Sequence, residues 1–375
     1  MSEVLSKKIK VLIVDDSALV RQMLSKILAE DSDIEVVGVA SDPYVARDKI
    51  KRLNPDVITL DVEMPRMDGL TFLENLMRLR PMPVVMVSTL TEKGADTTLQ
   101  ALELGAVDFV SKPKVDFSHS IQDYSDELIC KVKVAAGANV RALEALDAPA
   151  VKKVKAPLYG KLPAIDPKFS ADAILKKCDR PGRYSKTDRI IAMGASTGGT
   201  EAIKAVLMSL PAECPGIVVA QHIPEAFSKQ FADRINRICS LEVREAEDGM
   251  QVMPGSVYIA PGNRHLLIER DGNSLVCKLS DGPRVNRHRP SVDVLFRSVA
   301  QSAGPYSTGV ILTGMGDDGA RGIKELKDAG ASTIAQDEKT SVVWGMPSEA
   351  INHGGVDSIL PLQKIAEHIL KFTTN

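Results

Sequence analysis

The sequence predicts an α/β protein with two doubly wound sheets of mostly parallel strands, one in each half of the chain. Short apolar runs alternate with segments of helical spacing from Lys10 to Val110, and again from Ile190 to Phe372. Such alternation is typical of parallel strands joined by helical crossovers. Polar or small residues follow several of the runs, at the strand ends where open α/β sheets bind their ligands. A length of 375 residues accommodates two such domains and a connector.

The composition narrows the class of protein. Hydrophobic residues make up 44% and charged residues 26% of the chain, as in ordinary soluble proteins. A net charge of -2 argues against a general nucleic-acid binder. The first apolar run stops at Asp15-Asp16 and no run has membrane-spanning length, so we expect neither a signal peptide nor membrane insertion. The five cysteines form no CxxC pair and are expected to be reduced thiols in the cytoplasm.

The first half of the chain is predicted to form a five-stranded, doubly wound parallel sheet. Leu19, Met23 and Ile27 have the spacing of one helix face, and the other helices are recognised in the same way. The predicted strands are Lys10–Val14, Ile34–Ala40, Asp56–Leu60, Pro83–Val87 and Ala106–Val110. The predicted helices are Ser17–Glu30, Tyr44–Leu53, Leu70–Leu79 and Ala95–Leu104.

Chemically active side chains follow four of these strands. Asp15 and Asp16 follow the first and Asp61 the third, so three carboxylates are expected at one edge of the sheet. They repel one another unless a hard cation lies among them, and Mg²⁺ accepts such oxygen ligands while keeping waters. Ser88 and Lys112 follow two further strands, where a hydroxyl and an ammonium suit a transferred phosphoryl group. The alternative is a solvated acidic edge, which would explain the first two carboxylates but not the whole set.

These residues give the first half its resemblance to a known family. Residues 8–130 resemble the receiver domain of two-component response regulators, through the motifs Val14-Asp15-Asp16-Ser17, Asp61-Val62-Glu63-Met64-Pro65-Arg66-Met67-Asp68-Gly69, Ser88 and Lys112-Pro113. The resemblance implies that Asp61 accepts a phosphoryl group and that Asp15 and Asp16 are Mg²⁺ ligands. It also implies the backbone carbonyl of Glu63 as a third ligand, and places Phe109 where the family often has a switching aromatic.

A connector over residues 131–186 is predicted between the two domains. A final helix of the first domain is expected over Tyr124–Leu146, and a short helix over Ile165–Cys178. Between them, Ala148–Pro157 is rich in Pro, Ala and Lys, as in a semi-extended linker. Its lysines are either a solvated linker surface or a docking patch for an acidic partner.

The second half is predicted to form another doubly wound, mostly parallel α/β domain over residues 187–372. An apolar run from Ile190 opens it, and the turn Asp271-Gly272-Asn273 predicts a β-hairpin within it. Further strands are predicted at Gly216–Ala220, Val257–Ala260, His265–Glu269, Leu275–Leu279, Gly309–Thr313 and Ser332–Ala335. Helices are predicted at Phe227–Cys239, Val292–Ala300, Gly322–Ala329, Met346–His353 and Leu362–Phe372.

A small-residue turn after the Ile190 strand carries Ser196. Gly194-x-Ser196-x-Gly198 has the spelling of a nucleophile elbow, in which a strand–turn–helix exposes a serine at the carboxyl end of the strand. Two alternatives remain: a serine-rich turn that caps the helix, and a phosphate-binding loop at the helix N-terminus. The Gly-Lys-Ser/Thr ending of a P-loop is absent.

Two further strands of this domain end in residues that could complete a catalytic group. His222 follows one of them and Asp317-Asp318 follows the other, so a serine, an imidazole and a carboxylate share one sheet edge. The imidazole would accept the serine proton, and the carboxylate would fix the tautomer of the imidazole. The order Ser–His–Asp along the chain differs from that of α/β-hydrolases. Candidate oxyanion donors are the backbone N–H groups of Thr197, Gly198 and Met315.

Each of these residues has an alternative role. A single His after a strand is often a packing residue, and Asp317-Asp318 could cap a helix or form a second acidic phosphate site. Other histidines, His265, His288 and His353, compete with His222 as the base. None of them shows metal-ligand spacing such as HxxxH, so we expect no zinc.

Residues 187–372 as a whole resemble the catalytic domain of chemotaxis protein-glutamate methylesterases (CheB). The motifs are Gly194-Ala195-Ser196-Thr197-Gly198-Gly199, Gln221-His222-Ile223-Pro224, Ala260-Pro261-Gly262-Asn263-Arg264-His265, His288-Arg289-Pro290-Ser291-Val292-Asp293 and Thr313-Gly314-Met315-Gly316-Asp317-Asp318-Gly319. The resemblance implies Ser196 as the nucleophile and His222 as the base. It selects Asp318 over Asp317, because the acid of this family stands directly before a glycine. Four further residues of these motifs have two possible roles: they line a groove for acidic receptor helices, or they are structural. They are Arg264, His265, His288 and Arg289.

Together the two resemblances imply a phosphorylation-activated hydrolase of chemotaxis. It would remove methyl groups from glutamate γ-methyl esters of methyl-accepting chemotaxis receptors and deamidate receptor glutamines, with no cofactor for the ester chemistry. Its partners would be those receptors and the chemotaxis histidine kinase, the phosphodonor. The alternatives are a receptor-binding adaptor or phosphate sink without turnover, and a phospho-controlled acyl hydrolase with another substrate. A DNA-binding output is disfavoured, because no basic recognition helix is visible.

Overall fold

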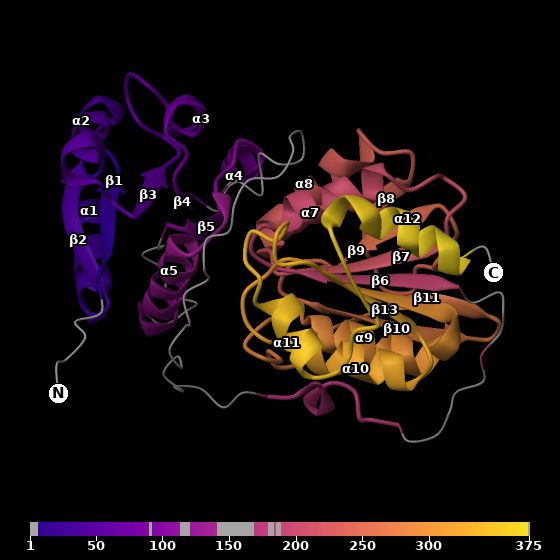
Figure 1. Cartoon of the computed structure of the whole chain (residues 1–375). Helices are drawn as coiled ribbons and strands as arrows, with labels where there is room; N and C mark the ends of the chain where they lie inside the picture. The colour runs from indigo at the N-terminus through magenta and orange to yellow at the C-terminus, as the bar shows by residue number, and fades with distance from the viewer. Residues whose placement is uncertain are drawn as a thin grey trace. The chain divides into compact units, whose positions relative to one another are not determined.

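The computed structural model describes residues 7–89, 92–112, 121–140, 169–178, 184 and 189–373. The chain divides into two compact units, Met1–Pro157 and Leu158–Asn375. Each unit has its own sheet (Figure 1).

The first unit is built on a five-stranded sheet in which every paired neighbour is parallel, in the order β2-β1-β3-β4-β5. This confirms the predicted doubly wound sheet. Its strands are β1 (Ile9–Val14), β2 (Ile34–Ala40), β3 (Val57–Asp61), β4 (Val84–Ser88) and β5 (Asp108–Ser111). Its helices are α1 (Ala18–Ala29), α2 (Pro43–Leu53), α3 (Gly69–Leu79), α4 (Glu92–Glu103) and α5 (Ile121–Ala136).

Local sequence explains where several of these helices begin and end. The side chains of Ser17 and Asp42 accept hydrogen bonds from backbone N–H groups in the first turns of α1 and α2, as N-caps do. α5 ends at Ala136, so the helix predicted over Tyr124–Leu146 is wrong for residues 137–139, whereas Val140 is again helical. Gly137 follows directly, and glycine favours the end of a helix. Residues 141–146 lie outside the described part of the chain.

The second unit is built on a seven-stranded parallel sheet in the order β14-β13-β12-β6-β7-β9-β8. Figure 1 shows α7, α8 and α12 on one face of this sheet and α9, α10 and α11 on the other. The strands are β6 (Ile190–Ala195), β7 (Gly216–Gln221), β8 (Glu242–Glu245), β9 (Ser256–Ile259), β12 (Ser307–Ile311), β13 (Ser332–Gln336) and β14 (Ser358–Leu360). The helices are α7 (Gly199–Met208), α8 (Glu225–Asn236), α9 (Val292–Ser302), α10 (Ala320–Asp328), α11 (Met346–Asn352) and α12 (Leu362–Thr373).

The predicted hairpin forms a separate two-stranded antiparallel sheet, β10 (His265–Asp271) with β11 (Ser274–Ser280). It shares a hydrophobic core with α9, α10, α11 and the large sheet. Phe296 of α9, Ile323 of α10 and Met346 of α11 are fully buried in this core. Because α9 is packed on all sides, its N-terminus has a fixed place beside the end of β12.

The predicted short helix over Ile165–Cys178 is wrong where the structure describes it. Only a 3₁₀ turn, η1 (Ala171–Ala173), forms there, with Ser170 as its N-cap. The rest of residues 169–178 is extended or bent, and Phe169 pairs with Val285 in an isolated parallel bridge. Residues 165–168 lie outside the described part of the chain.

Residues 169–178, which we call the strap, lie against the second unit. The carbonyl oxygen of Phe169 accepts a hydrogen bond from the backbone N–H of Asn286 at 3.0 Å. The guanidinium of Arg297, which is only 5% exposed, donates to Asp172 at 2.8 Å and to the carbonyl of Leu175 at 2.9 Å. The C-terminal part of the predicted connector therefore packs as a piece of the second unit.

A fragment that starts at Thr187 lacks the strap, so we expect it to be less stable than one that starts at Leu158. Without the strap, a small apolar cluster is exposed to solvent, and Glu325 remains as the acidic partner of Arg297. We expect the free energy of unfolding to fall by about 2–4 kcal/mol, and the melting midpoint by about 5–10 °C. The fluorescence of Trp344, the only tryptophan, follows the transition. Equal midpoints would show that the strap does not stabilise this unit.

Candidate functional site

The candidate site of the second unit lies at the switch point of its sheet. β6 is central, with β7 on one side and β12 on the other, so the crossovers leave β6 in opposite directions. Ser196 follows β6 and His222 follows β7, and the residues before them, Ala195 and Gln221, are paired in the sheet. The backbone N–H of Ser196 bonds to the carbonyl of Thr313, which follows β12, at 3.1 Å. Three strand ends thus meet at the serine.

Glycines allow the backbone to close tightly around Ser196. A Cβ atom on Gly314 would lie 2.8 Å from the Cβ of Ser196, closer than real side chains approach. Gly198, the N-cap of α7, has a φ of 74°, in the left-handed region that glycine adopts easily. The side-chain amide of Gln221 donates to the carbonyl of Ser196 at 3.0 Å and holds the turn against β7. The small residues of the motif are therefore needed for close approach.

His222 is oriented by its contacts on both the ring edge and the ring face. Its Nε2 lies 2.8 Å from Oδ2 of Asp318. Its Nδ1 is buried and has no hydrogen-bond partner among the residues described. The ring of His288 stacks on it, with 3.7 Å between centroids and 8° between planes. With a proton on Nε2 donated to the carboxylate, Nδ1 has its lone pair available to accept a proton.

The carboxylate of Asp318 is 1% exposed and accepts hydrogen bonds at both oxygens. The N-terminus of α9 points at it, with backbone N–H groups of Val292 at 2.7 Å and Asp293 at 3.3 Å. Burial by itself would raise the pKa of Asp318, but its hydrogen bond to His222, the nearby His288 ring and a bond from Asn286 hold the pKa below the usual range. The remaining donors to this carboxylate are the side chains of Ser291 and Asn286, each at 2.8 Å.

The other candidate residues lie differently. His265 is fully buried, accepts from the backbone N–H of Ser291 at Nδ1 and contacts the carbonyl of Pro283 at Nε2, and burial lowers its pKa. It is therefore held as a neutral structural residue. His353 is exposed at the end of α11. It is Asp318, and not Asp317, whose carboxylate contacts His222.

The two arginines of the predicted groove are held by neighbouring polar groups. Arg264 forms a bidentate pair with Asp281 at 2.8 and 3.0 Å. Arg289 donates to the side-chain oxygen of Asn263 and to the carbonyls of Asp281 and Gly282. Both arginines remain partly accessible at the surface, so the two interpretations of these residues stay open.

The predicted oxyanion donors lie next to Ser196. Thr197 and Gly198 lead directly into α7, where the first backbone N–H groups of the helix point toward the turn. Met315 follows Gly314, the glycine that lies against Ser196. The backbone N–H of Ser196 itself is bonded to Thr313 and is committed to the fold.

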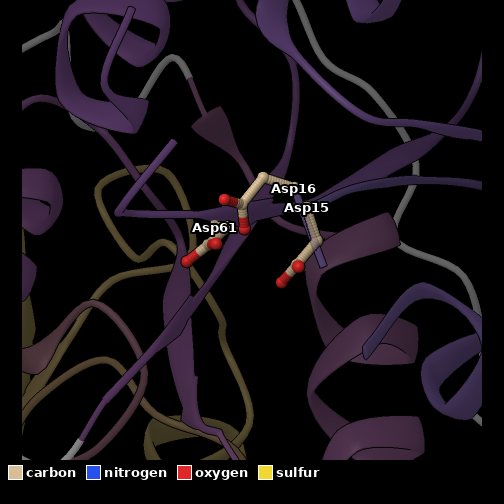
Figure 2. Close-up of side chains that lie close together, drawn as sticks. All are labelled: Asp15, Asp16 and Asp61. Carbon is tan, nitrogen blue, oxygen red and sulfur yellow. The ribbon is translucent and has the colours of Figure 1, made fainter. Parts of the chain in front are cut away.

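In the first unit, the three predicted carboxylates come together at one edge of the sheet. Figure 2 shows Asp15, Asp16 and Asp61 with their side chains close to one another, and each offers an oxygen within 4.8 Å of the others. Asp15 and Asp61 are only 1% exposed. Lys112 reaches into this cluster, with its Nζ 2.7 Å from Asp61 and 3.4 Å from Asp15.

Burial dominates the electrostatics of this cluster. It raises the pKa of Asp61 to about 6, with Lys112 opposing and Asp15 adding to the rise. It also raises the pKa of Asp15. Ser88, the other predicted phosphoryl contact, is buried at the end of β4 with its hydroxyl 2.7 Å from that of Thr98.

Two further residues of the first unit have the placement that the receiver resemblance implies. Glu63 follows β3 two residues after Asp61, and its backbone N–H bonds to the Asp61 carboxylate at 3.3 Å. Phe109 is buried in β5, and the Nζ of Lys131 lies 5.0 Å above its ring. The roles of ligand and switch stay predictions.

We expect Asp61→Asn to stabilise the first unit when Mg²⁺ is absent. The pKa of Asp61 in the folded state, about 6, lies above its ordinary value of 3.8, so the ionised carboxylate destabilises the fold at pH 7. Replacing it with a neutral amide should raise the free energy of unfolding by about 1–3 kcal/mol at pH 7. This gain should shrink as the pH falls through 6 toward 4, where the wild-type group is itself protonated.

Calorimetry of the whole chain measures this effect, because the transition of the first unit is identified by its response to added Mg²⁺. Glu63→Gln is the matched control, since Glu63 is an exposed carboxylate in the same loop. It should leave the midpoint unchanged. A lower midpoint for Asp61→Asn at pH 7 would contradict the expectation.

Sequence reasoning did not single out the groups that hold the candidate acid. Ser291 is recognisable afterwards as the N-cap of α9, a serine placed before an apolar helical pattern. Asn286 carries no such signal, because its contact with Asp318 crosses 32 residues of sequence and depends on how the loop before α9 folds.

In the part of the chain that the structure describes, none of the helices is long and apolar enough to span a bilayer.

Comparison with known proteins agrees with this architecture. Residues 11–121 match the family model of the response regulator receiver domain, and residues 191–369 match that of the CheB methylesterase. Over 370 residues the chain is 58% identical to the protein-glutamate methylesterase/protein-glutamine glutaminase of Hydrogenovibrio crunogenus, covering 97% of this chain and 98% of that one.

Relatives of the same name occur in other organisms. One from Xanthomonas euvesicatoria pv. vesicatoria is 57% identical over 368 residues, 98% of each chain. One from Geobacter metallireducens is 57% identical over 364 residues, 97% of this chain and 96% of that one. The chain therefore belongs to the CheB family of protein-glutamate methylesterases/protein-glutamine glutaminases, in which a response regulator receiver domain precedes a methylesterase domain.

Proposed function

We propose that this chain is a phosphorylation-activated hydrolase of receptor glutamate γ-methyl esters, with Ser196 as nucleophile, His222 as base and Asp318 as the orienting acid. The same site would deamidate receptor glutamines. One observation carries the assignment: Nε2 of His222 is held by the carboxylate, while Nδ1 is buried and has no partner among the described residues. A ring held in this way is ready to accept a proton at Nδ1. Family membership supports the substrate class.

The chemistry follows from these groups. Nδ1 of His222 accepts the proton of the Ser196 hydroxyl while Oγ attacks the ester carbon, and the carbonyl oxygen becomes an oxyanion. Backbone N–H groups of Thr197, Gly198 and Met315 are the proposed donors to that oxyanion. The intermediate collapses as the imidazolium returns the proton to the leaving methanol, which leaves an acyl-serine. Water then repeats the two steps and releases the carboxylic acid; with glutamine as substrate the first leaving group is ammonia.

The first unit would regulate the hydrolase activity through phosphorylation. Asp61 is the proposed phosphoryl acceptor, with Ser88 and Lys112 contacting the phosphoryl group. Asp15, Asp16, Asp61 and the Glu63 carbonyl are the proposed Mg²⁺ ligands. The residues fit such a cation, because buried Oδ2 of Asp15 has no hydrogen bond among the described residues and only a long ion pair with Lys112, at 3.4 Å, and burial raises the pKa of both Asp15 and Asp61. Bound Mg²⁺ would neutralise the negative charge of the carboxylates and the phosphoryl group.

The partners follow from the same proposal. Methyl-accepting chemotaxis receptors are the substrate and the chemotaxis histidine kinase is the phosphodonor. Since both present their reacting groups on the cytoplasmic side, we place the protein in the cytoplasm. A fragment that contains only the second unit should be more active than the unphosphorylated whole chain if the receiver is inhibitory.

Methanol release from methylated receptor membranes tests both halves of the proposal. Wild type and Ser196→Ala are compared, each with and without a small phosphodonor and Mg²⁺. Release that requires Ser196 and rises with phosphodonor is the expected result. Release that requires Ser196 but does not change with phosphodonor would support the hydrolase activity and refute its regulation by phosphorylation. No release from wild type under any condition would refute the proposed activity.

A further inference from the structure

Asn286 lies between two buried carboxylates next to the candidate site. Its side-chain nitrogen donates to Oδ2 of Asp293 at 2.6 Å and to Oδ1 of Asp318 at 2.8 Å, and the residue is only 6% exposed. An amide NH₂ has two hydrogens, so both bonds form at the same time. The amide oxygen cannot take this place, because it would face two carboxylates. Asn286 is thus a neutral bridge between two acids.

The backbone of Asn286 is fixed as firmly as its side chain. Its N–H donates to the carbonyl of Phe169 in the strap at 3.0 Å, and the adjacent Val285 exchanges two backbone hydrogen bonds with His288. Its φ of 50° lies in the left-handed region, which asparagine tolerates better than most residues. His288 in turn stacks on His222. One short loop therefore contacts both the acid and the base of the site.

We infer that Asn286 is a positioning residue for the hydrolysis, which holds the Asp318 carboxylate so that its second oxygen faces Nε2 of His222. This inference rests on the proposed function of the site. Asn286 also separates two acids that would otherwise interact directly, because Asp293 lies in the first turn of α9 and its own backbone N–H contacts Asp318. The strap contacts Asn286 and the adjacent Val285, so residues 169–178 hold the loop that carries this asparagine.

The hydrogen-bond donors that Asp318 keeps when Asn286 is replaced determine how much activity is lost. Without the amide, Asp318 keeps the hydroxyl of Ser291 and the N–H groups at the start of α9. It would stay buried but would be repelled by Asp293, the pKa of which is raised by burial and by Asp318. We therefore expect a partial loss, of the size of one hydrogen bond to a charged group, rather than the complete loss expected for a reacting residue.

The test uses the full chain with Asn286→Gly and Asn286→Asp, assayed for methanol release from methylated receptor membranes with phosphodonor and Mg²⁺ held constant. Glycine keeps the left-handed backbone and removes the whole side chain, including the amide. We expect kcat to fall about tenfold to a hundredfold with KM changed less than about twofold. The acid limb of the kcat/KM profile should move to higher pH, because a carboxylate with one donor fewer interacts more strongly with a protonated imidazole. A purely structural role would not move this limb.

Asn286→Asp keeps the shape of the side chain but introduces a third carboxylate, so its loss of activity should exceed that of Asn286→Gly and grow with pH. If the glycine variant unfolds below the assay temperature, the Asn286→Asp variant tests the positioning role by itself. Arg287→Gly is the matched control: it changes an adjacent, exposed, left-handed residue, with a φ of 71°, and should keep kcat within about twofold.

Two outcomes overturn different claims. If Ser196→Ala is inactive while both Asn286 variants match Arg287→Gly in kcat and in pH profile, the positioning role is wrong and the proposed function stands. If Ser196→Ala keeps wild-type turnover, the proposed function itself is wrong, whatever the Asn286 variants do.

Discussion

Ser196→Ala is expected to abolish methanol release from methylated receptors, with a fall in kcat of about 10⁴-fold or more. The reason is chemical: without Oγ no acyl-enzyme can form, and only direct attack by water remains. Removal of the nucleophile from a hydrolase of this type typically costs about 10⁶-fold, and the oxyanion site and substrate binding account for the residual rate. Because Ser196 is partly exposed and a methyl group fits the same turn, the variant should melt at the same temperature as the wild type.

Ser209→Ala is the matched control for this change. Ser209 follows the same helix α7, is exposed, and bonds through its hydroxyl to the carbonyl of Ala205. Its replacement should leave turnover unchanged. If Ser196→Ala retained more than about a hundredth of the wild-type kcat, the serine would not be the nucleophile, and an activated water or another side chain would have to take its role.

Receptor binding separates the enzyme from an adaptor. The alanine variant should sediment with receptor membranes as well as the wild type does, because the change removes one oxygen atom. Loss of binding together with normal turnover of the bound fraction would favour an adaptor that uses Ser196 as a contact.

The sheet edges of both units could be predicted because the signals there are local. Apolar runs mark the buried parallel strands, and a polar residue that ends such a run has to emerge at the carboxyl edge. Asp61, Ser196 and His222 were placed in this way without any knowledge of side-chain contacts, and the structure brings each of them to a strand end.

Other features could not be predicted, because they depend on pairing between distant parts of the chain. β8 has the sequence Glu242-Val243-Arg244-Glu245, which has no apolar run, and it is a strand because it pairs with β9. β14 is a three-residue edge strand that pairs with β13. Propensity is a weak guide at sheet edges, where one side of the strand faces solvent.

The strap shows the same limit in the connector. Phe169 and Asp172 lie in the predicted connector, in a segment expected to be a short helix, yet they contact Asn286 and Arg297, more than a hundred residues further along the chain. The amino-acid composition of a segment indicates how readily it is solvated, but not whether it packs against another part of the chain. The environment of Asp318 could not be predicted for the same reason, since its donors in residues 286–293 are brought to it only by the tertiary fold.

Asp318→Asn is the second change from which we expect a very large effect. In the structure, Oδ1 of Asp318 accepts from Asn286, Ser291 and the N–H of Asp293. Three donors at this position require the oxygen of the new amide to face them. Its NH₂ group then takes the place of Oδ2, opposite His222, where it also faces the backbone N–H of Val292 and loses that hydrogen bond.

An NH₂ group in that place reverses the tautomer of His222. Nε2 would have to accept a hydrogen bond, which moves the ring proton to Nδ1, the nitrogen that should receive the proton of Ser196. The base is then blocked although the new side chain has nearly the same shape as the old one. A comparable carboxylate-to-amide change in a Ser-His-Asp enzyme lowers kcat by about 10⁴-fold. We expect a loss of about 10³- to 10⁴-fold here, measured as methanol release at saturating substrate.

Asp317→Asn is the neighbouring control. Asp317 is partly exposed, and its carboxylate is not the one that contacts His222, so its replacement should change kcat less than about twofold. If Asp317→Asn were the damaging change and Asp318→Asn were mild, the orienting acid would be wrongly assigned. If both were mild, His222 would work without a carboxylate, and the buried environment of Asp318 would be structural. At high pH, hydroxide can take the proton of Ser196 in place of the blocked ring, so Asp318→Asn should recover in part, whereas Ser196→Ala has no serine hydroxyl and should not recover by this route.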